Sequence, residues 1–587
     1  MKRKFVVVAL AVIMLAACEK TPIVNEGLPY NDTVGLNVDM LRPILKELYD
    51  ATGGPDWKEQ PNWMEEDDLN KWNLISITLR DGTIDLNLKK NGLKGILPAS
   101  LASLPLAYLN LSNNELTGDL PANLGANGYL TDLELSNNNF TGNLPTSLAN
   151  SRINYFSATN NRFSGEIPTV IKSMQNYRDF VDLLSPQQEG FGFTGLEIES
   201  INPDDIQILK NFYNLQSVNF QLSVNWEDNN VEDWKGVYWG GDGRCRGLSL
   251  TFQAITGTRE LLQNLTTLTS LDLHNTQIDE VLDLSNMKEL IYLDLSSNHL
   301  YKLPEGLEQC SNLHVLDLSY NHIKSEIPSS FNNLRELRLL NLNDNYFYGK
   351  MAVLNQLTKL RFFNISENKR LDAQPLPEWI GHCLDLMELY MTDCSFTGTI
   401  PDSWKNLVNL KELKLSSNLL SGDIQSSFKR MRNLTLLDLS NNKFKGNLPE
   451  FSENNNIISL FLTQNNFTGT IPENWSVLKQ LQKLDLLGNK LTGTIPDFFL
   501  SLEDLLNLDV QYNLMAGILP QCLQNHPHIN NWFYKDQNNG VLSFAETSLT
   551  AVRPIQAAST AKQMQYTTGQ ASEDYKAALK AELFRVK

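Results

Sequence analysis

Aspartates recur at one offset in three successive stretches of this chain, at Asp272, Asp294 and Asp317. If these stretches stack as neighbouring strands, the carboxylates form a column with a spacing of about 4.8 Å. Such an acidic column could bind calcium or supply paired acids for catalysis. A recurring Leu-Asp-Leu-Ser motif places an aspartate at this offset in any case. We therefore interpret the column as part of a repeat and predict no metal site.

Two histidines also share an offset, because His299 and His322 each follow a regularly spaced asparagine. Stacking would bring the imidazoles to about 5 Å from each other, which suits a shared metal ion. No third ligand stands at this offset, where Tyr346 and Lys369 follow instead. The pattern favours surface side chains.

Catalytic signatures are absent from the sequence. The segment Gly240-Gly241-Asp242-Gly243 lacks the Lys and Ser or Thr of a phosphate-binding loop and is typical of a turn. No H-E-x-x-H, G-x-S-x-G or protein-kinase motif occurs. We predict that the protein is not an enzyme and uses no cofactor.

Composition and charge limit the partners further. The chain has 587 residues and a formal net charge of −18, from 49 basic and 67 acidic residues. This charge disfavours nucleic acid and electrostatic binding to anionic membranes. Beyond Cys18, the spacing of the cysteines matches neither a zinc site nor a disulfide framework, which predicts buried free thiols. These cysteines are Cys245, Cys310, Cys383, Cys394 and Cys522.

An internal repeat dominates the chain, with the pattern L-x-x-L-x-L-x-x-N-x-L-x-G, often followed by Ile-Pro or Leu-Pro. Its anchor asparagines form two arrays. The first array contains Asn91, Asn114, Asn138 and Asn161. The second contains Asn298, Asn321, Asn345, Asn368, Asn418, Asn442, Asn465, Asn489 and Asn513, with degenerate members at Gln253, Thr276 and Cys394.

Each Leu-x-Leu predicts a short strand whose leucines point inward, while the anchor asparagine turns inward to satisfy backbone groups at the following bend. One repeat cannot bury its apolar face alone, so the repeats must stack into a parallel sheet.

The repeats resemble plant-type leucine-rich repeats, through segments such as Leu116-Thr117-Gly118-Asp119-Leu120-Pro121 and Leu491-Thr492-Gly493-Thr494-Ile495-Pro496. That class includes the ectodomains of plant receptor-like kinases, polygalacturonase-inhibitor proteins and bacterial surface proteins. The resemblance covers about two-thirds of the chain. It implies an α/β solenoid, a leucine-rich-repeat superhelix with a parallel β-sheet on its concave face.

Each array follows a helical pattern and a group of tryptophans, which predicts two capped solenoids. The tryptophans are Trp57, Trp63 and Trp72 before the first array, and Trp226, Trp234 and Trp239 before the second. We interpret them as caps over the exposed end of each core and not as a ligand site. The cysteine pair usual in the caps of the plant class is missing, so no cap disulfide is expected.

The N-terminus carries a basic segment, a short apolar segment and Leu15-Ala16-Ala17-Cys18, which resembles the lipobox of bacterial lipoproteins. The resemblance implies cleavage before Cys18 and its lipidation; an ordinary signal peptide with an incidental cysteine is the alternative. The expected organisation is a signal peptide (1–17), the lipidated cysteine and a tether (18–37), a cap with about four repeats (38–170), a linker (171–200), a second cap with about twelve repeats and a C-terminal cap (201–535), and a flexible tail (536–587).

The outward strand positions carry the candidate binding residues. Six residues before the anchors stand Tyr292, Val315, Leu339 and Phe362, an apolar stripe about 15 Å long. Four residues before the anchors run Asp294, Asp317, Asn341, Asn364 and Tyr390. An apolar stripe beside short polar side chains is typical of a recognition surface. The alternative is that the apolar residues are incidental, or that the cap or the tail covers them.

These observations favour a non-catalytic binding or adhesion protein of the cell envelope, which recognises a peptide, protein or glycan with the concave face of the second array. An enzyme inhibitor or host-interaction decoy is the alternative, by analogy with the polygalacturonase-inhibitor group, and an enzyme is a third class. The expected location is the bacterial outer membrane, at the cell surface or on the periplasmic side. Membrane contact would run only through the lipid, and no nucleic-acid partner is expected.

Overall fold

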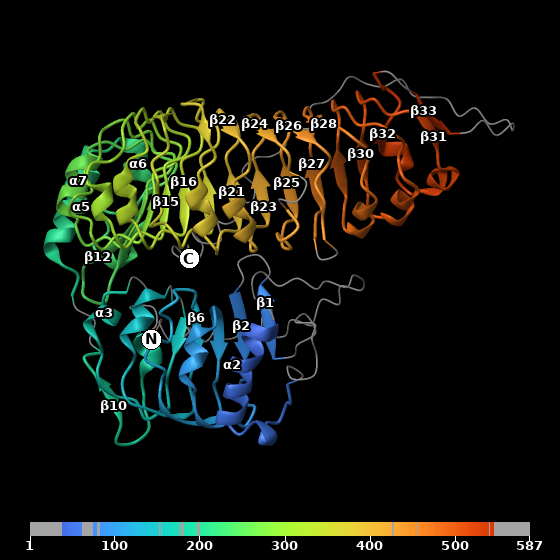
Figure 1. Ribbon diagram of the computed structural model, residues 1–587. Helices are drawn as coiled ribbons and strands as arrows, with labels where there is room; N and C mark the ends of the chain where they lie inside the picture. The colour runs from blue at the N-terminus through green and yellow to red at the C-terminus, as the bar shows by residue number, and fades with distance from the viewer. Residues whose placement is uncertain are drawn as a thin grey trace.

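The computed structural model describes residues 38–61, 74–78, 83–538 and 541–544, except 152, 154, 175–176, 178–180, 197–199, 425–427 and 453–454. The predicted signal peptide, Cys18 with its tether, Trp63, Trp72 and the predicted tail after Phe544 lie outside the described residues. Two stacks of short strands make up the molecule (Figure 1). The predicted α/β solenoid with parallel strands is confirmed.

The second array forms a sheet of 14 strands. Its first pair, β11 (Val237–Trp239) and β12 (Cys245–Ser249), is antiparallel, and every later neighbour pair is parallel. The later strands are β13 (Ser270–Asp272), β14 (Tyr292–Asp294), β15 (Val315–Asp317), β16 (Leu339–Asn341), β18 (Phe362–Asn364), β21 (Glu388–Tyr390), β23 (Glu412–Lys414), β25 (Leu436–Asp438), β27 (Ser459–Phe461), β29 (Lys483–Asp485), β30 (Asn507–Asp509) and β32 (Trp532–Phe533).

The first array forms a separate sheet of five strands, which are β1 (Ile75–Thr78), β2 (Thr83–Asn87), β4 (Leu106–Asn110), β6 (Asp132–Glu134) and β8 (Tyr155–Ser157). It also begins with an antiparallel pair, β1 with β2. Because both sheets start in the same way, each has its own capped beginning.

A second set of short strands follows the anchor positions on the other side of each coil. These strands are β3 (Lys94–Ile96), β5 (Glu115–Asp119), β7 (Asn139–Thr141), β9 (Ser164–Glu166), β10 (Gly192–Thr194), β17 (Tyr348–Gly349), β19 (Arg370–Leu371), β20 (Gln374–Pro375), β22 (Phe396–Gly398), β24 (Leu419–Gly422), β26 (Lys443–Gly446), β28 (Asn466–Phe467), β31 (Gly517–Leu519) and β33 (Leu542–Phe544). Many of the Pro residues that follow them begin 3-10 helices, such as η8 (Ser329–Asn333), η10 (Asp402–Asn406) and η11 (Glu473–Val477).

The anchor asparagines tie neighbouring coils together. In the Asn321 coil, the side-chain NH₂ donates to the carbonyl oxygens of Leu295 at 2.9 Å and Leu318 at 3.1 Å. Its Oδ1 accepts the N–H of Leu300 at 3.0 Å. These bonds satisfy buried backbone groups at the bend after each strand. The same arrangement occurs at Asn114, Asn138, Asn161, Asn298, Asn345, Asn368, Asn418, Asn442, Asn465, Asn489 and Asn513.

A glutamine ends each asparagine ladder. Gln187 Nε2 donates to the carbonyls of Ala158 at 2.9 Å and Leu184 at 2.6 Å, as an anchor asparagine would. Gln537 does the same with Val510 and Tyr534, both at 2.9 Å. Within the segment 171–200, predicted as a linker, the described residues therefore extend the first array, and β10 pairs with β9 there. Likewise the C-terminal cap runs past residue 535, because β33 pairs with β31.

Helices and indoles cover the first coil of each array. Helix α2 (Val38–Ala51) buries Leu41, Leu45 and Leu48. Before the second array, α5 (Pro203–Leu215) and α6 (Val218–Ser223) lie against Trp226 and Trp234, whose rings stack at 5.6 Å. Their indole N–H groups donate to the carbonyls of Lys235 and Asp228, so the polar atoms of both rings are used within the cap.

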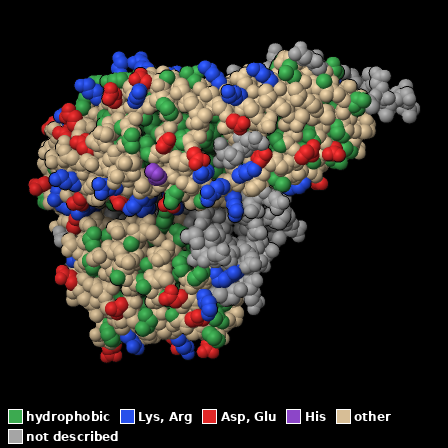
Figure 2. All heavy atoms as spheres, in the orientation of Figure 1, with side chains coloured by type: hydrophobic (Ala, Val, Ile, Leu, Met, Phe, Trp, Pro, Cys, Tyr) green, Lys and Arg blue, Asp and Glu red, His purple; other side chains and the backbone are tan. Residues whose placement is uncertain are grey.

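The chain doubles back at the junction, so that the first array lies alongside the second (Figure 1). Several contacts between described residues join them, including hydrogen bonds to backbone carbonyls. The N–H of Gly241 donates to the carbonyl of Lys172 at 3.0 Å. A Cβ at Gly241 would lie 2.2 Å from the Tyr177 ring, so the close approach requires glycine. Further along, Arg338 Nη2 donates to the carbonyl of Asn127 at 2.9 Å. Figure 2 shows Lys and Arg side chains gathered along this seam.

Among the described residues, no helix is both long enough and apolar enough to cross a membrane.

Candidate ligand-binding face

The stripe of Tyr292, Val315, Leu339 and Phe362 lies on the adjacent strands β14, β15, β16 and β18 of the second sheet, of which β15 and β16 are labelled in Figure 1. Each residue begins a three-residue strand and stands directly opposite the next. The leucine or phenylalanine at the centre of each strand packs in the main core, as Leu293 and Leu316 do. Because side chains alternate along a strand, the stripe points to the other side of the sheet.

The stripe is closed to solvent. Its side chains are only 0–2% exposed, and with Tyr390 they form a hydrophobic cluster separate from the main core. The sequence left open whether this face is exposed or covered, and in the structure these four side chains are buried. The repeat spacing determines which side of the sheet a residue occupies, but what lies over that side is a tertiary property.

Short polar side chains run beside the stripe. Asp294 Oδ1 accepts the N–H of Ser296 at 2.9 Å and its hydroxyl at 2.6 Å, and Asp317 binds Ser319 at the same distances. Asn341 Nδ2 donates to Asp317 Oδ2 at 2.8 Å. The next residue in this column, Asn364, accepts the N–H of Ser366 at 3.0 Å. The column therefore holds the turn after each strand while it lines the same face as the stripe.

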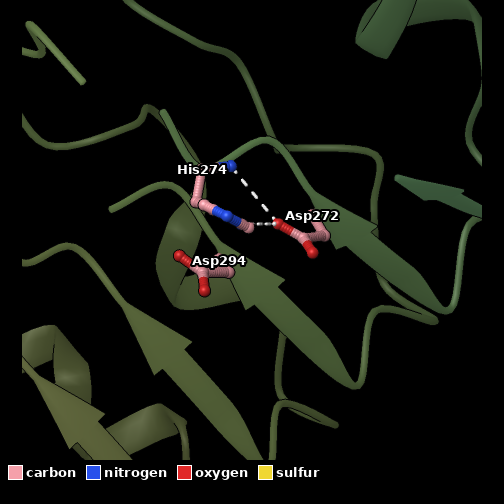
Figure 3. Close-up of side chains that lie close together, drawn as sticks. All are labelled: Asp272, His274 and Asp294. Carbon is pink, nitrogen blue, oxygen red and sulfur yellow. Dashed lines mark hydrogen bonds and ion pairs between the residues drawn. The ribbon is translucent and has the colours of Figure 1, made fainter. Parts of the chain in front are cut away.

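His274 joins the beginning of this column, as Figure 3 shows. Its ring Nδ1 lies 2.7 Å from Asp272 Oδ1, and its backbone N–H donates to the same oxygen at 3.3 Å. His274 thus takes the place that Ser296 has in the next repeat. Asp272, His274 and Asp294 each offer a ligand atom, and these atoms lie within 4.8 Å of one another. Two carboxylates and an imidazole suit a divalent cation, although the repeated turn explains the His–Asp contact without an ion. Sequence reasoning missed His274 because only the anchor offsets were compared.

Tyr390 closes the other end of the stripe, with its ring edge-on to Phe362 at 5.5 Å. Its hydroxyl lies 2.7 Å from both Glu388 Oε2 and Glu412 Oε2, and Lys414 Nζ lies 4.2 Å from its ring centre. Burial raises the pKa of Glu388, and the nearby charge of Glu412 raises it further. This cluster marks the point where the apolar stripe gives way to charged outward positions.

A cavity of about 1140 Å³ lies between the two arrays, where the strands of the second sheet begin. Its walls carry acidic, basic and amide groups, for example Glu289, Arg338 and Asn127. Tyr129 contributes an aromatic face. Charged groups of both signs line this cavity, whereas the side chains of the stripe are apolar.

The two histidines singled out in the sequence are exposed and stack on each other at 5.7 Å, and His322 also stacks on Tyr346 at 5.8 Å. Stacking of neighbouring repeats explains their proximity without a shared metal ion. Of the cysteines, Cys245, Cys310, Cys383 and Cys394 are buried free thiols, whereas Cys522 is partly exposed. Cys394 takes an anchor position, and its thiol points to the carbonyl of Ile365 at 3.1 Å.

Comparison with known families identifies leucine-rich repeats in both arrays. The description "Leucine rich repeat" matches residues 289–347 and 385–444, and "Leucine Rich Repeat" also matches 105–127, 129–151 and 480–502. The fold is therefore a leucine-rich-repeat solenoid of the α/β class. Such proteins typically bind ligands or other proteins.

Among curated proteins, fibromodulin of Bos taurus is 44% identical over 71 residues, which are 12% of this chain and 18% of that protein. Fibromodulin of Sus scrofa is 42% identical over 71 residues, or 12% of this chain and 46% of that sequence. The chain thus matches less than half the length of either relative.

Similar solved structures come from plants and bacteria. The plant peptide hormone receptor RGFR1 in complex with RGF2 has 25% identity and a TM-score of 0.46, over 80% of this chain and 68% of that one. The ectodomain of the Arabidopsis receptor kinase HAESA, in complex with an extended IDA peptide hormone, has 22% identity and a TM-score of 0.45, over 87% and 86%. A leucine-rich-repeat protein of Leptospira interrogans has 22% identity and a TM-score of 0.34, over 74% and 92%.

Proposed function

We propose that this protein is a non-catalytic binding or adhesion module of the bacterial cell envelope, which recognises a peptide, protein or glycan on the concave face of its second array. The observation that carries the proposal is the pairing of the stripe with the adjacent polar column, in register over successive strands. A ligand would gain energy from the apolar side chains by replacing the atoms that now bury them, whereas the ordered carboxylates and amides supply direction.

The polar column supports recognition because its groups are held in fixed positions. Asp294, Asp317 and Asn341 keep their orientation through bonds to their own turns and to each other. A preorganised polar group loses little conformational freedom when a ligand binds. The face can therefore distinguish ligands by charge and hydrogen bonding as well as by apolar area.

Capture of envelope, host and polysaccharide fractions on immobilised full-length protein tests this function. The double variant Tyr292→Ser/Phe362→Ser should lose the captured ligand, whereas Leu436→Ser, at the same outward offset outside the stripe, should retain it. Removal of a buried aromatic side chain lowers the folding stability by about 3–5 kcal/mol, so the double variant could lose the ligand by unfolding. Asp317→Asn serves as a second variant because it changes the polar column and keeps the apolar packing. Unchanged capture by both stripe and column variants, or turnover of a substrate, would contradict the proposal.

The cell-envelope location is part of the proposal and depends on Cys18. Radiolabelled palmitate should label the wild-type chain and not a Cys18→Ala variant, since the thiol would carry the lipid. Protease treatment of intact cells should then degrade the repeats if they face outward. Equal labelling of both chains would argue against lipidation at Cys18.

A further inference from the structure

One tyrosine hydroxyl of the second sheet contacts two carboxylates on neighbouring strands, β21 and β23 (both labelled in Figure 1). The hydroxyl of Tyr390 lies 2.7 Å from Oε2 of Glu388 and 2.7 Å from Oε2 of Glu412. The Tyr390 side chain is only 5% exposed, and both glutamates are partly buried. A phenol has a single hydrogen, so it donates a full hydrogen bond to only one of the two oxygens.

The second contact is favourable only if a further proton lies in it. Ionised carboxylates are acceptors only, and two of them this close together in a partly buried site repel each other. A protonated carboxyl, in contrast, donates to the phenol oxygen while the phenol donates to the other carboxylate. The short distances to both glutamates therefore indicate that Glu388 and Glu412 hold one proton between them.

The charges of β23 determine which carboxyl carries this proton. Lys414 Nζ lies 3.0 Å from Glu412 Oε2, so the ammonium favours the ionised form of Glu412. Burial raises the pKa of Glu388, and the charge of Glu412 raises it further. The Tyr390 hydroxyl, Lys414 and Lys411 lower this pKa, but the effect of burial and of Glu412 is larger. The proton therefore belongs mainly to Glu388.

The strand on the other side, β18, presents groups that do not titrate. Phe362 and Asn364 stand opposite the outward residues of β21. Arg361 precedes them, and its guanidinium lies over the ring of Tyr129 in the first array, 4.4 Å from the ring centre. The ring of Tyr390 packs edge-on against Phe362 at 5.5 Å. Tyr390 thus connects the end of the apolar stripe to the two glutamates.

We propose that Glu388, Tyr390 and Glu412 form a proton-controlled switch at the end of the stripe. With the proton in place, a hydrogen-bonded chain from Glu388 through the hydroxyl to Glu412 holds the Tyr390 ring against Phe362. Without it, two carboxylates compete for one hydrogen, and the ring is released.

The direction of the switch follows from the raised pKa of Glu388. The folded state binds this proton more tightly than the unfolded chain, so the held form is complete at acidic pH. It is lost as the pH rises through the raised pKa. Because Tyr390 belongs to the candidate binding face, ligand capture should fall over the same pH range. This consequence rests on the proposed function, whereas the switch itself does not.

Hydroxyl-radical footprinting of the full-length chain from pH 5 to pH 9, followed by peptide mapping, tests the switch. Oxidation of Tyr390 should rise at least about threefold towards alkaline pH, relative to the exposed Tyr348. Glu388→Gln and Glu412→Gln should each abolish the rise, because the amide supplies the missing hydrogen at every pH. Glu503→Gln, which changes an exposed glutamate of the same array, should respond to pH as the wild type does.

Oxidation of Tyr390 that stays constant with pH in the wild-type chain would overturn the switch, and so would an equal rise in Glu388→Gln. The wild-type measurement needs no substitution, so misfolding of a variant cannot hide this failure.

The switch and the proposed function fail separately. A Tyr390 that responds to pH in a chain that captures no fraction leaves the switch and removes the function. Capture by a chain whose Tyr390 does not respond leaves the function and removes the switch. If both hold, wild-type capture should fall at least about threefold between pH 5 and pH 9, and capture by Glu388→Gln should not change with pH.

Discussion

The guanidinium of Arg361 lies 4.4 Å from the ring centre of Tyr129, which belongs to the other array. Arg338 lies over the same ring at 5.3 Å and also donates to the backbone of residue 127. Two arginines of successive strands thus hold one tyrosine of the first array. Together with the bond from Gly241 to Lys172, they fix the doubled-back arrangement of the arrays.

Removal of that ring should loosen the junction. The Tyr129→Ala variant loses two cation–π contacts, each worth about 0.5–2 kcal/mol. We expect the arrays to separate more readily, which small-angle X-ray scattering should record as a larger radius of gyration. Tyr301→Ala, which removes an exposed tyrosine of the second array, should leave that radius unchanged. A Tyr129→Ala profile identical to that of wild type would show that the other junction contacts suffice.

Loss of an anchor asparagine should destabilise its coil. Asn321→Ala leaves the carbonyls of Leu295 and Leu318 and the N–H of Leu300 without this partner in a dry site. Each unsatisfied buried group costs about 1–3 kcal/mol, so we expect a loss of at least about 3 kcal/mol. Urea denaturation measures it. Asn312→Ala, which removes one exposed hydrogen bond, should cost less than about 1 kcal/mol.

Stability should depend on pH through Asp509. Burial raises the pKa of its carboxyl from 3.8 to about 6, and the charge of Asp485 contributes. The folded state then binds the proton more tightly than the unfolded state, so stability is lost as pH rises from about 4 through 6. Asp509→Asn should remove this loss. Urea midpoints should show the variant more stable than wild type at pH 8 by at most about 3 kcal/mol, with a smaller difference at pH 4. The exposed Asp372→Asn change should shift neither midpoint. A difference independent of pH would contradict the assignment.

The thiols should differ in reactivity. Burial raises the pKa of Cys310, Cys383 and Cys394 to about 12, and it also raises the pKa of Cys245. Because the thiolate is the reactive form, iodoacetamide at pH 8 should leave these four sites unmodified in the native chain. Peptide mapping should find Cys522 modified first and the others only in denaturant. Rapid native labelling of Cys310 would show that its coil opens.

The repeat pattern in the sequence predicted most of the fold but less of the candidate binding face. The repeat spacing predicted which leucines enter the core, because a strand exposes alternate residues to opposite sides. It did not predict that Gln187 and Gln537 end the ladders, since one extra methylene hides the resemblance to asparagine. Nor did it predict His274, whose ring replaces a serine hydroxyl in the turn of Asp272.

The sequence by itself determined the stacking unit, the anchor asparagines and the sidedness of Tyr292, Val315, Leu339 and Phe362, because these depend on contacts between neighbouring repeats. Only the tertiary structure decided that the arrays double back on Tyr129 and that the stripe is closed to solvent. The junction depends on contacts between residues about 200 positions apart. The burial of the stripe depends on the atoms that lie over that side of the sheet. Neither follows from the spacing of the repeats.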